Sequence, residues 1–223
     1  MSHFNPEALQ FLADLAVHND RDWFAENRKT YEQKVRDPFK GFVAEVIAAC
    51  AEREPAFATL EPKHCIFRIN RDTRFSKDKQ PSKTHLSAGI SPGGKESGDP
   101  GLYVHFDAER LVVGGGAYLV ENDDLYVLRE HIASQPERFN QLLADPDFSG
   151  RYGALQGARN VRIPKEFREA AEVCPHILNK QFFYMAELPV EQVVSPALMD
   201  TVMEHFDAAA EVRQFLRAGL QAG

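Results

Sequence analysis

The sequence predicts an α+β fold, in which a mostly antiparallel sheet is flanked by helices near the two ends of the chain. Helical periodicity dominates the N-terminal third of the chain and is found again after Pro196, near its end, whereas short β-rich segments separated by Gly and Pro occupy the middle. Such segregation favours an α+β architecture. We expect a single domain over residues 1–223, because there are no repeats, no long linker and no low-complexity tail.

The N-terminal region is expected to form several helices. The pair Asn5-Pro6 supplies a capping residue followed by proline at the first helical position. The pair Asn19-Asp20 offers capping residues for a second helix. The pair Asp37-Pro38 predicts a break and a restart, because proline suits a first turn and not a helix interior. Apolar residues then repeat at helical spacing up to about Arg53.

The middle of the chain is expected to supply most of the sheet. His64–Asn70 is rich in β-forming residues and predicts a strand, and a Gly/Pro-rich loop follows at Ser91–Gly101. Leu102–Phe106 and Leu111–Val113 predict two strands joined through Asp107–Arg110. These two strands should form a hairpin.

The C-terminal half is expected to alternate helices with short extended segments. Asp123–Ser134 and Pro136–Ala144 predict helices, and Val161–Ile163 predicts a strand or turn. Gln181–Leu188 is an apolar run that predicts a strand. A final helix is expected from Ser195-Pro196 to about Arg217.

Composition excludes several classes of protein. No window approaches the run of about 18 apolar residues that a membrane span needs. The N-terminus lacks a basic n-region, and acidic residues interrupt its apolar positions, so it does not resemble a signal peptide. The three cysteines Cys50, Cys65 and Cys174 are odd in number and lack metal-ligand spacing. We therefore expect a cytoplasmic protein with reduced thiols, no metal and no cofactor.

The segment Arg68–His85 concentrates positive charge in an acidic protein. Its local net charge is +4, whereas the whole chain has a formal net charge of −7, so the remaining residues carry −11. One hypothesis is that carboxylates from elsewhere neutralise these cations. The other is that the arginines hold a phosphate or carboxylate bidentately while the lysines act as point charges. The sequence leaves both open.

The acidic balance of the chain bears on the kind of anion. A long polyanion would meet the whole acidic surface, whereas a small ligand meets mainly its own pocket. The sequence therefore favours a small anionic ligand. Nucleic acid is the less favoured partner, although Phe67, Phe75 and Tyr103 offer aromatic rings on which bases could stack.

Two histidines are candidates for proton transfer. Tyr103, His105 and Asp107 alternate, so a strand would place all three on one face. His105 is then a general base oriented by Asp107, a metal ligand, or simply part of a polar outer face. His85, at the end of the basic segment, is the second acid–base candidate. Gly115 either lets a ligand approach the backbone closely or belongs to a bulge or tight turn.

Two motifs together resemble a known family. The first is the basic run RDTRFSKDKQPSKTH, and the second is NDRDWFAENRKTYE, with the series Asn19, Arg21, Trp23, Phe24, Asn27 and Tyr31. The triple glycine at 114–116 and the pair Pro164-Lys165 fit as well. The chain resembles the domain of unknown function 2461, an uncharacterised conserved family. The resemblance implies a shared fold and pocket and no assigned reaction.

We therefore expect a soluble protein that binds a small phosphate- or carboxylate-bearing ligand. If it is an enzyme, hydrolase or transferase chemistry is the broadest class that these residues support, with His85 and His105 as proton carriers. The alternative is a non-catalytic module that binds RNA or a protein. The expected ligand-binding residues are Arg68, Arg71, Arg74, Lys77, Lys79, Lys83, Tyr103 and Gly115.

Overall fold

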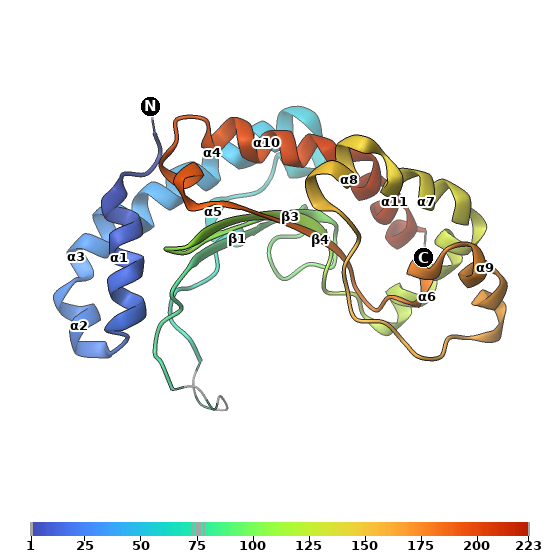
Figure 1. Cartoon of the computed structure of the whole chain (residues 1–223), viewed down its shortest axis with the longest axis horizontal. Coiled ribbons are helices and arrows are strands. Elements are labelled where there is room, and N and C mark those ends of the chain that lie inside the picture. Colours follow the sequence, from blue (N-terminus) through green and yellow to red (C-terminus); the bar gives the residue numbers. More distant parts are fainter. Residues whose placement is uncertain (1, 73, 75–76, 78, 223) are drawn as a thin grey trace. The chain divides into compact units, whose positions relative to one another are not determined.

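The computed structural model describes residues 2–72, 74, 77 and 79–222 (Figure 1). Helices account for 56% of the described residues, and the sheet is antiparallel, so the predicted α+β class is confirmed. Among the described residues, none of the helices combines the length and the apolar character needed to cross a membrane.

Within the described residues the sheet has four strands, which lie in sequence order, β1-β2-β3-β4. The strands are β1 (Leu86–Ile90), β2 (Gly101–Phe106), β3 (Arg110–Ala117) and β4 (Phe182–Pro189). The turn at Asp107–Arg110 joins β2 to β3, which confirms the predicted hairpin. The predicted strand at Gln181–Leu188 is confirmed as β4.

Helices supply the rest of the regular structure. The α-helices are α1 (Pro6–Val17), α2 (Arg21–Glu26), α3 (Arg28–Thr30), α4 (Asp37–Arg53), α5 (Pro62–Cys65), α6 (Asn122–Ser134), α7 (Pro136–Ala144), α8 (Pro146–Tyr152), α9 (Arg168–Val173), α10 (Leu198–Ala208) and α11 (Ala210–Gln221). The other helical segments are the π-helix η1 (Tyr31–Arg36) and the 3₁₀ turns η2 (Pro55–Phe57), η3 (Lys165–Phe167), η4 (Pro175–Leu178) and η5 (Val190–Val194). The predicted helices at 123–134 and 136–144 correspond to α6 and α7.

The chain divides into two compact units, and three strands and α10 contribute residues to both. Unit 1 comprises Met1–Ile90, Tyr103–Val113 and Glu187–Met203. Unit 2 comprises Ser91–Leu102, Gly114–Ala186 and Glu204–Gly223. A single domain stays a prediction.

The core of unit 1 is built from phenylalanines of the N-terminal helices and of β2. The ring centroid of Phe106 lies 4.9 Å from that of Phe4 and 5.8 Å from that of Phe39, both in edge-on geometry. Leu102, Val104 and Phe106 are buried, whereas Tyr103 and His105, at the alternate positions of β2, are half-buried. The predicted alternation is therefore confirmed, and it turns the tyrosine and the histidine away from the phenylalanine core.

The core of unit 2 buries two guanidinium groups. The Arg129 side chain donates to the carbonyls of Ile177 and Asn179, at 2.9 and 3.1 Å. Arg213, 1% exposed, donates from Nη1 to the carbonyl of Phe206 at 2.8 Å and lies 3.6 Å from the centroid of its ring. Backbone carbonyls therefore offset part of the cost of burying these cations.

Three sequence predictions about local elements are wrong in whole or in part. His64–Asn70 is not a continuous strand, because α5 ends at Cys65 and only isolated antiparallel bridges follow. Pro62 at the first helical position starts that short helix. Asp37-Pro38 does start a helix as predicted, with the proline in the first turn of α4, but no break precedes it because η1 leads directly into α4. Val161–Ile163 forms no strand, and a bend lies at Val161.

The final helix is also different from the prediction. It is not continuous from 195 to 217, since α10 begins at Leu198 and is separated from α11 by Ala209. Ser195 still begins the turn that leads into α10, because its hydroxyl oxygen accepts a hydrogen bond from the N–H of Ala197 at 3.1 Å. Propensity alone did not reveal the division, since Ala209 is itself a strong helix former.

Candidate functional site

The basic segment lies on an irregular antiparallel hairpin in unit 1, which we define as residues 66–88 and call the basic hairpin. Its two sides are joined by isolated bridges between Ile66 and Ala88 and between Asn70 and Ser82. The N–H of Lys83 donates to the carbonyl of Ile69 at 2.7 Å. Because the second side continues into β1, the hairpin is anchored to the edge of the sheet.

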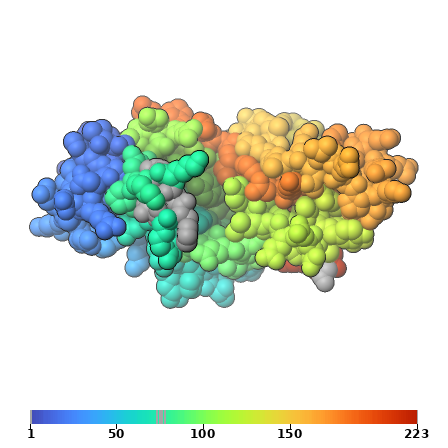
Figure 2. All heavy atoms as spheres, turned by 90° about the horizontal axis from the view of Figure 1, so that it is seen from below, coloured from blue at the N-terminus to red at the C-terminus, as the bar shows by residue number. Residues whose placement is uncertain are grey.

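The predicted cations of the hairpin differ in exposure. Arg68, Arg74, Lys77 and Lys79 are exposed, and the hairpin, in teal, lies on the surface seen in Figure 2. Arg71 and Lys83 are half-buried. Phe75, proposed above for base stacking, lies outside the described residues.

Carboxylates of the described residues neutralise only part of the positive charge of the basic hairpin. Arg74 Nη2 lies 2.6 Å from Asp72 Oδ2, an exposed pair that lowers the pKa of the Asp72 carboxyl through side-chain and backbone hydrogen bonds. Arg68, Lys77 and Lys83 form no ion pair within the described part of the chain. Internal neutralisation therefore has support at Arg74 and none at these three positions.

Lys83 lies against apolar and cationic neighbours. Its Nζ is 5.3 Å from the centroid of the Phe67 ring, a cation–π contact. Burial, and then the nearby charge of Arg71, lower the pKa of Lys83. A bound anion would offset both effects, because it attracts the ammonium and replaces lost hydration.

Two imidazoles stack beside Lys83. The rings of His85, just before β1, and His105, on β2, have centroids 4.3 Å apart and an interplanar angle of 14°. Burial, followed by the charges of His105 and Lys83, lowers the pKa of His85 to about 4. Burial also lowers the pKa of His105, although Asp107 opposes the shift. Both rings are therefore neutral at pH 7 and have protonatable nitrogens.

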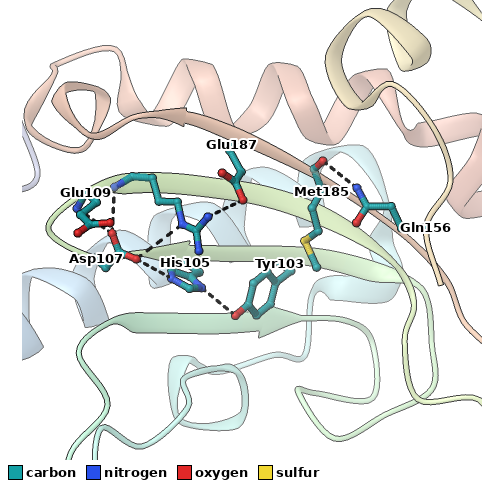
Figure 3. Close-up of polar contacts among 8 residues, drawn as sticks. Tyr103, His105, Asp107, Glu109, Gln156, Met185 and Glu187 are labelled. Atoms are coloured by element: carbon teal, nitrogen blue, oxygen red, sulfur yellow. Dashed lines mark hydrogen bonds and ion pairs between the residues drawn. The ribbon is translucent and has the colours of Figure 1, made fainter. Parts of the chain in front are cut away.

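His105 lies between a hydroxyl and a carboxylate (Figure 3). Its Nδ1 is 3.3 Å from the Tyr103 hydroxyl oxygen, and its Nε2 is 3.6 Å from Asp107 Oδ2. The carboxylate favours the proton on Nε2, which leaves Nδ1 to accept from the Tyr103 hydroxyl. A hydroxyl, an imidazole and a carboxylate in a row can pass a proton along the strand.

The position of Asp107 is fixed by the turn that follows β2. Asp107 Oδ1 accepts from the N–H groups of Glu109 and Arg110, at 2.8 and 2.9 Å. Burial would raise the pKa of Asp107, but these backbone hydrogen bonds outweigh it and lower the pKa. Arg110 in turn pairs with Glu187 on β4, Nη1 to Oε1, at 2.6 Å. Asp107 is thus an ionised carboxylate held toward His105.

We call Lys83, His85, Tyr103, His105 and Asp107 the histidine site, and all five belong to unit 1. Sequence reasoning named each of these residues but gave no reason to expect the ring stack, because His85 and His105 are twenty residues apart. Gly115 lies elsewhere, within unit 2. A Cβ there would lie 2.2 Å from the carbonyl oxygen of Gly101, so strand packing alone requires glycine. Its role toward a ligand stays a prediction.

Asn19 is a residue whose role the sequence did not predict. Asp20, not Asn19, caps α2, by accepting from the N–H groups of Asp22 and Trp23. The Asn19 side chain instead donates to the carbonyl of Ser82 at 2.9 Å and accepts from the Ser82 N–H at 3.1 Å. This double hydrogen bond attaches the basic hairpin to the N-terminal helices, beside Lys83. The sequence signal for this role was the place of Asn19 in the second family motif.

Within the described ranges, no group of three or more His, Cys, Asp or Glu side chains is arranged to hold a metal ion.

A comparison with protein families identifies the family to which the chain is related. The model of a conserved hypothetical protein family, DUF2461, matches residues 7–215 and so includes both the basic hairpin and the strand that carries His105. A comparison with curated proteins gave no match. Since the family match spans nearly the whole sequence, this chain belongs to the DUF2461 family of conserved hypothetical proteins.

Proposed function

We propose that the protein binds a small phosphate- or carboxylate-bearing ligand at the histidine site. The observation that carries this proposal is the stack of two neutral imidazoles beside Lys83, whose ammonium has no carboxylate partner among the described residues. A partly buried ammonium without a counter-ion is costly, so an anionic ligand has a favourable place there. The exposed cations of the hairpin raise the local concentration of anions around it.

His85 supplies a directional contact to this ligand. Its ring nitrogens form no hydrogen bond with any described residue, so an N–H of the ring can donate to a ligand oxygen. A charge-assisted bond from Lys83 and a second bond from His85 would orient a phosphate or carboxylate. Arg71, half-buried at the start of the connecting segment, is the third candidate contact.

Where the ligand reacts, proton transfer follows the row of Tyr103, His105 and Asp107. A hydroxyl of the ligand or of water gives its proton to the Tyr103 oxygen while Tyr103 passes its own proton to His105 Nδ1. The oxygen that loses the proton becomes the nucleophile, and Asp107 stabilises the imidazolium. Such a row serves a hydrolase or a transferase.

The exposure of four hairpin cations favours a second candidate, an RNA-binding surface. An extended strand could cross Arg68, Arg74, Lys77 and Lys79 without entering the histidine site. Four phosphate contacts with a single strand predict a log–log salt dependence of affinity with a slope of about −3. A small ligand held at the histidine site gives a much flatter dependence.

A thermal-shift panel tests the proposal on wild-type protein and two variants, Lys83→Met and the control Lys40→Met. The panel contains inorganic phosphate, nucleoside monophosphates, dicarboxylates and short RNAs. We expect a small anion at 100 times its Kd to add about 2.7 kcal/mol, or roughly 5 to 11 °C. The shift should disappear in Lys83→Met and persist in Lys40→Met, because Lys40 is an exposed residue of α4. Equal shifts in both variants, or none with any anion, would contradict the proposal.

We also propose a cytoplasmic location. Cys174 has a free, buried thiol. Free thiols are typical of a reducing compartment.

A further inference from the structure

Unit 1 has a concave surface whose lining residues are separate from those of the histidine site. It is a groove of about 450 Å³ on the N-terminal helices. We call it the helical groove; its lining residues are Glu7, Gln10, Phe11, Asp14, Trp23, Asn27, Lys29, Thr30, Gln33 and Lys34. Its volume is within the range of small-molecule sites. The second sequence motif contributes Trp23 and Asn27, which the proposed function leaves unexplained.

An aromatic surface forms one wall of the groove. Trp23 is half-buried, and its ring centroid lies 5.4 Å from that of the buried Phe11. His18 stacks beside it, with a centroid distance of 6.1 Å and an interplanar angle of 21°. The indole is thus held in place by packing while part of it lines the groove. Because the indole ring is already fixed, it provides a flat, weakly polar surface on which a ligand can pack at small entropic cost.

The rest of the lining is polar but balanced in charge. Glu7 and Lys34 form an ion pair of 2.8 Å, and Asp14 accepts from Gln10 Nε2 at 2.8 Å. With Lys29, the groove has two carboxylates and two ammonium groups, so its formal charge is zero. Unlike the basic hairpin, the groove therefore does not favour a strongly anionic or a strongly cationic ligand.

Amide side chains supply donors and acceptors around this indole surface. Gln10, Asn27 and Gln33 each have both kinds of group, and a neutral amide can bond either side of a hydroxyl. Asn27 Nδ2 donates to the carbonyl of Trp23 at 2.9 Å, which leaves its side-chain oxygen as an acceptor. Gln33 and Lys34 belong to the π-helix η1. Wide π-helical turns often occur at functional sites.

We propose that the helical groove binds a neutral saccharide. The C–H face of a sugar ring would pack on Trp23, and its hydroxyls would bond the amides of Gln10 and Gln33 and the carboxylate of Asp14. A flat indole surface surrounded by amides and balanced charges suits a ligand that has many hydroxyls and no charge. This inference is independent of the proposed anion site.

Tryptophan fluorescence tests the groove directly, because Trp23 is the single tryptophan of the chain. The wild type is titrated with methyl glucoside, methyl galactoside, maltose, cellobiose and lactose, with glycerol as the solvent control. We expect a saturable change with at least one saccharide. In Gln33→Ala and Gln10→Ala, which alter exposed side chains, the Kd should rise at least fivefold. Lys83→Met should leave it unchanged.

Three outcomes would overturn the inference. The first is no saturable change with any of the saccharides. The second is a change that persists with equal Kd in both glutamine variants, since binding would then occur elsewhere. The third is an equal, saturable response to inorganic phosphate, because the groove would then not select a neutral ligand.

Discussion

Gly115→Ala is expected to lower the free energy of unfolding by about 3 kcal/mol or more, which corresponds to a fall in Tm of roughly 6 to 12 °C. The added Cβ would lie 2.2 Å from the carbonyl oxygen of Gly101 and 3.1 Å from the Tyr184 hydroxyl. The first of these atoms is backbone on β2, so the strand itself must move. The loss should be seen by circular dichroism in the absence of any ligand.

The matched control is Gly41→Ala, the same substitution in α4. Gly41 is exposed, and a Cβ there would meet no atom within 4 Å. Alanine is the better helix former, so this variant should gain about 0.5 to 1 kcal/mol. A Gly115→Ala variant as stable as Gly41→Ala would show that β2 and β3 do not approach as closely as described.

Asn19→Ala is expected to destabilise the protein by about 2 to 4 kcal/mol. The change removes both hydrogen bonds to Ser82, which is 4% exposed, and leaves its N–H and its carbonyl without these partners. Asn19→Asp should be at least as harmful. A carboxylate can still accept from the Ser82 N–H, but its second oxygen would face the Ser82 carbonyl oxygen and repel it.

Hydrogen exchange and urea denaturation check this prediction together. The amide of Ser82 should exchange faster in both Asn19 variants. Asn5→Ala is the control, because Asn5 is exposed and makes no capping bond to the backbone of α1. That variant should stay within about 0.5 kcal/mol of wild type. Unchanged protection of Ser82 in Asn19→Ala would refute the proposed attachment of the hairpin.

The elements that could be predicted correctly from the sequence are marked by sequence signals within or beside them. In the hairpin of β2 and β3, Tyr103 and His105 alternate with buried residues of β2, and Asp107 in the turn accepts from the N–H groups of residues 109 and 110. Helix α7 begins at Pro136, where proline at the first position marks a start. Such signals lie within a few residues of the element that they define.

The features that sequence could not predict depend on pairing between distant segments. The stack of His85 on His105 requires the register between β1 and β2, which no local pattern specifies. Asn19 has the composition of a helix cap, and only the position of Ser82, 63 residues later, gives it a different partner. The segment 66–70 is β-rich, yet its partner strand pairs with it only at isolated bridges.

The pH dependence of His85 follows from its burial. Its pKa is lowered from 6.5 to about 4, so in acid the unfolded chain takes up a proton before the folded chain does. The contribution of this neutral histidine to stability is therefore complete above pH 6.5 and is lost as the pH falls toward 4. A bound anion should oppose the shift, because it stabilises the imidazolium.

The most direct test of the anion site is an NMR titration of the His85 imidazole against pH, with and without inorganic phosphate. We expect a pKa of about 4 in the free protein and a higher value when phosphate is present. The phosphate effect should vanish in Lys83→Met and persist in Lys40→Met. A His85 ring that titrates near 6.5, or whose pKa does not respond to phosphate, would contradict the proposed site.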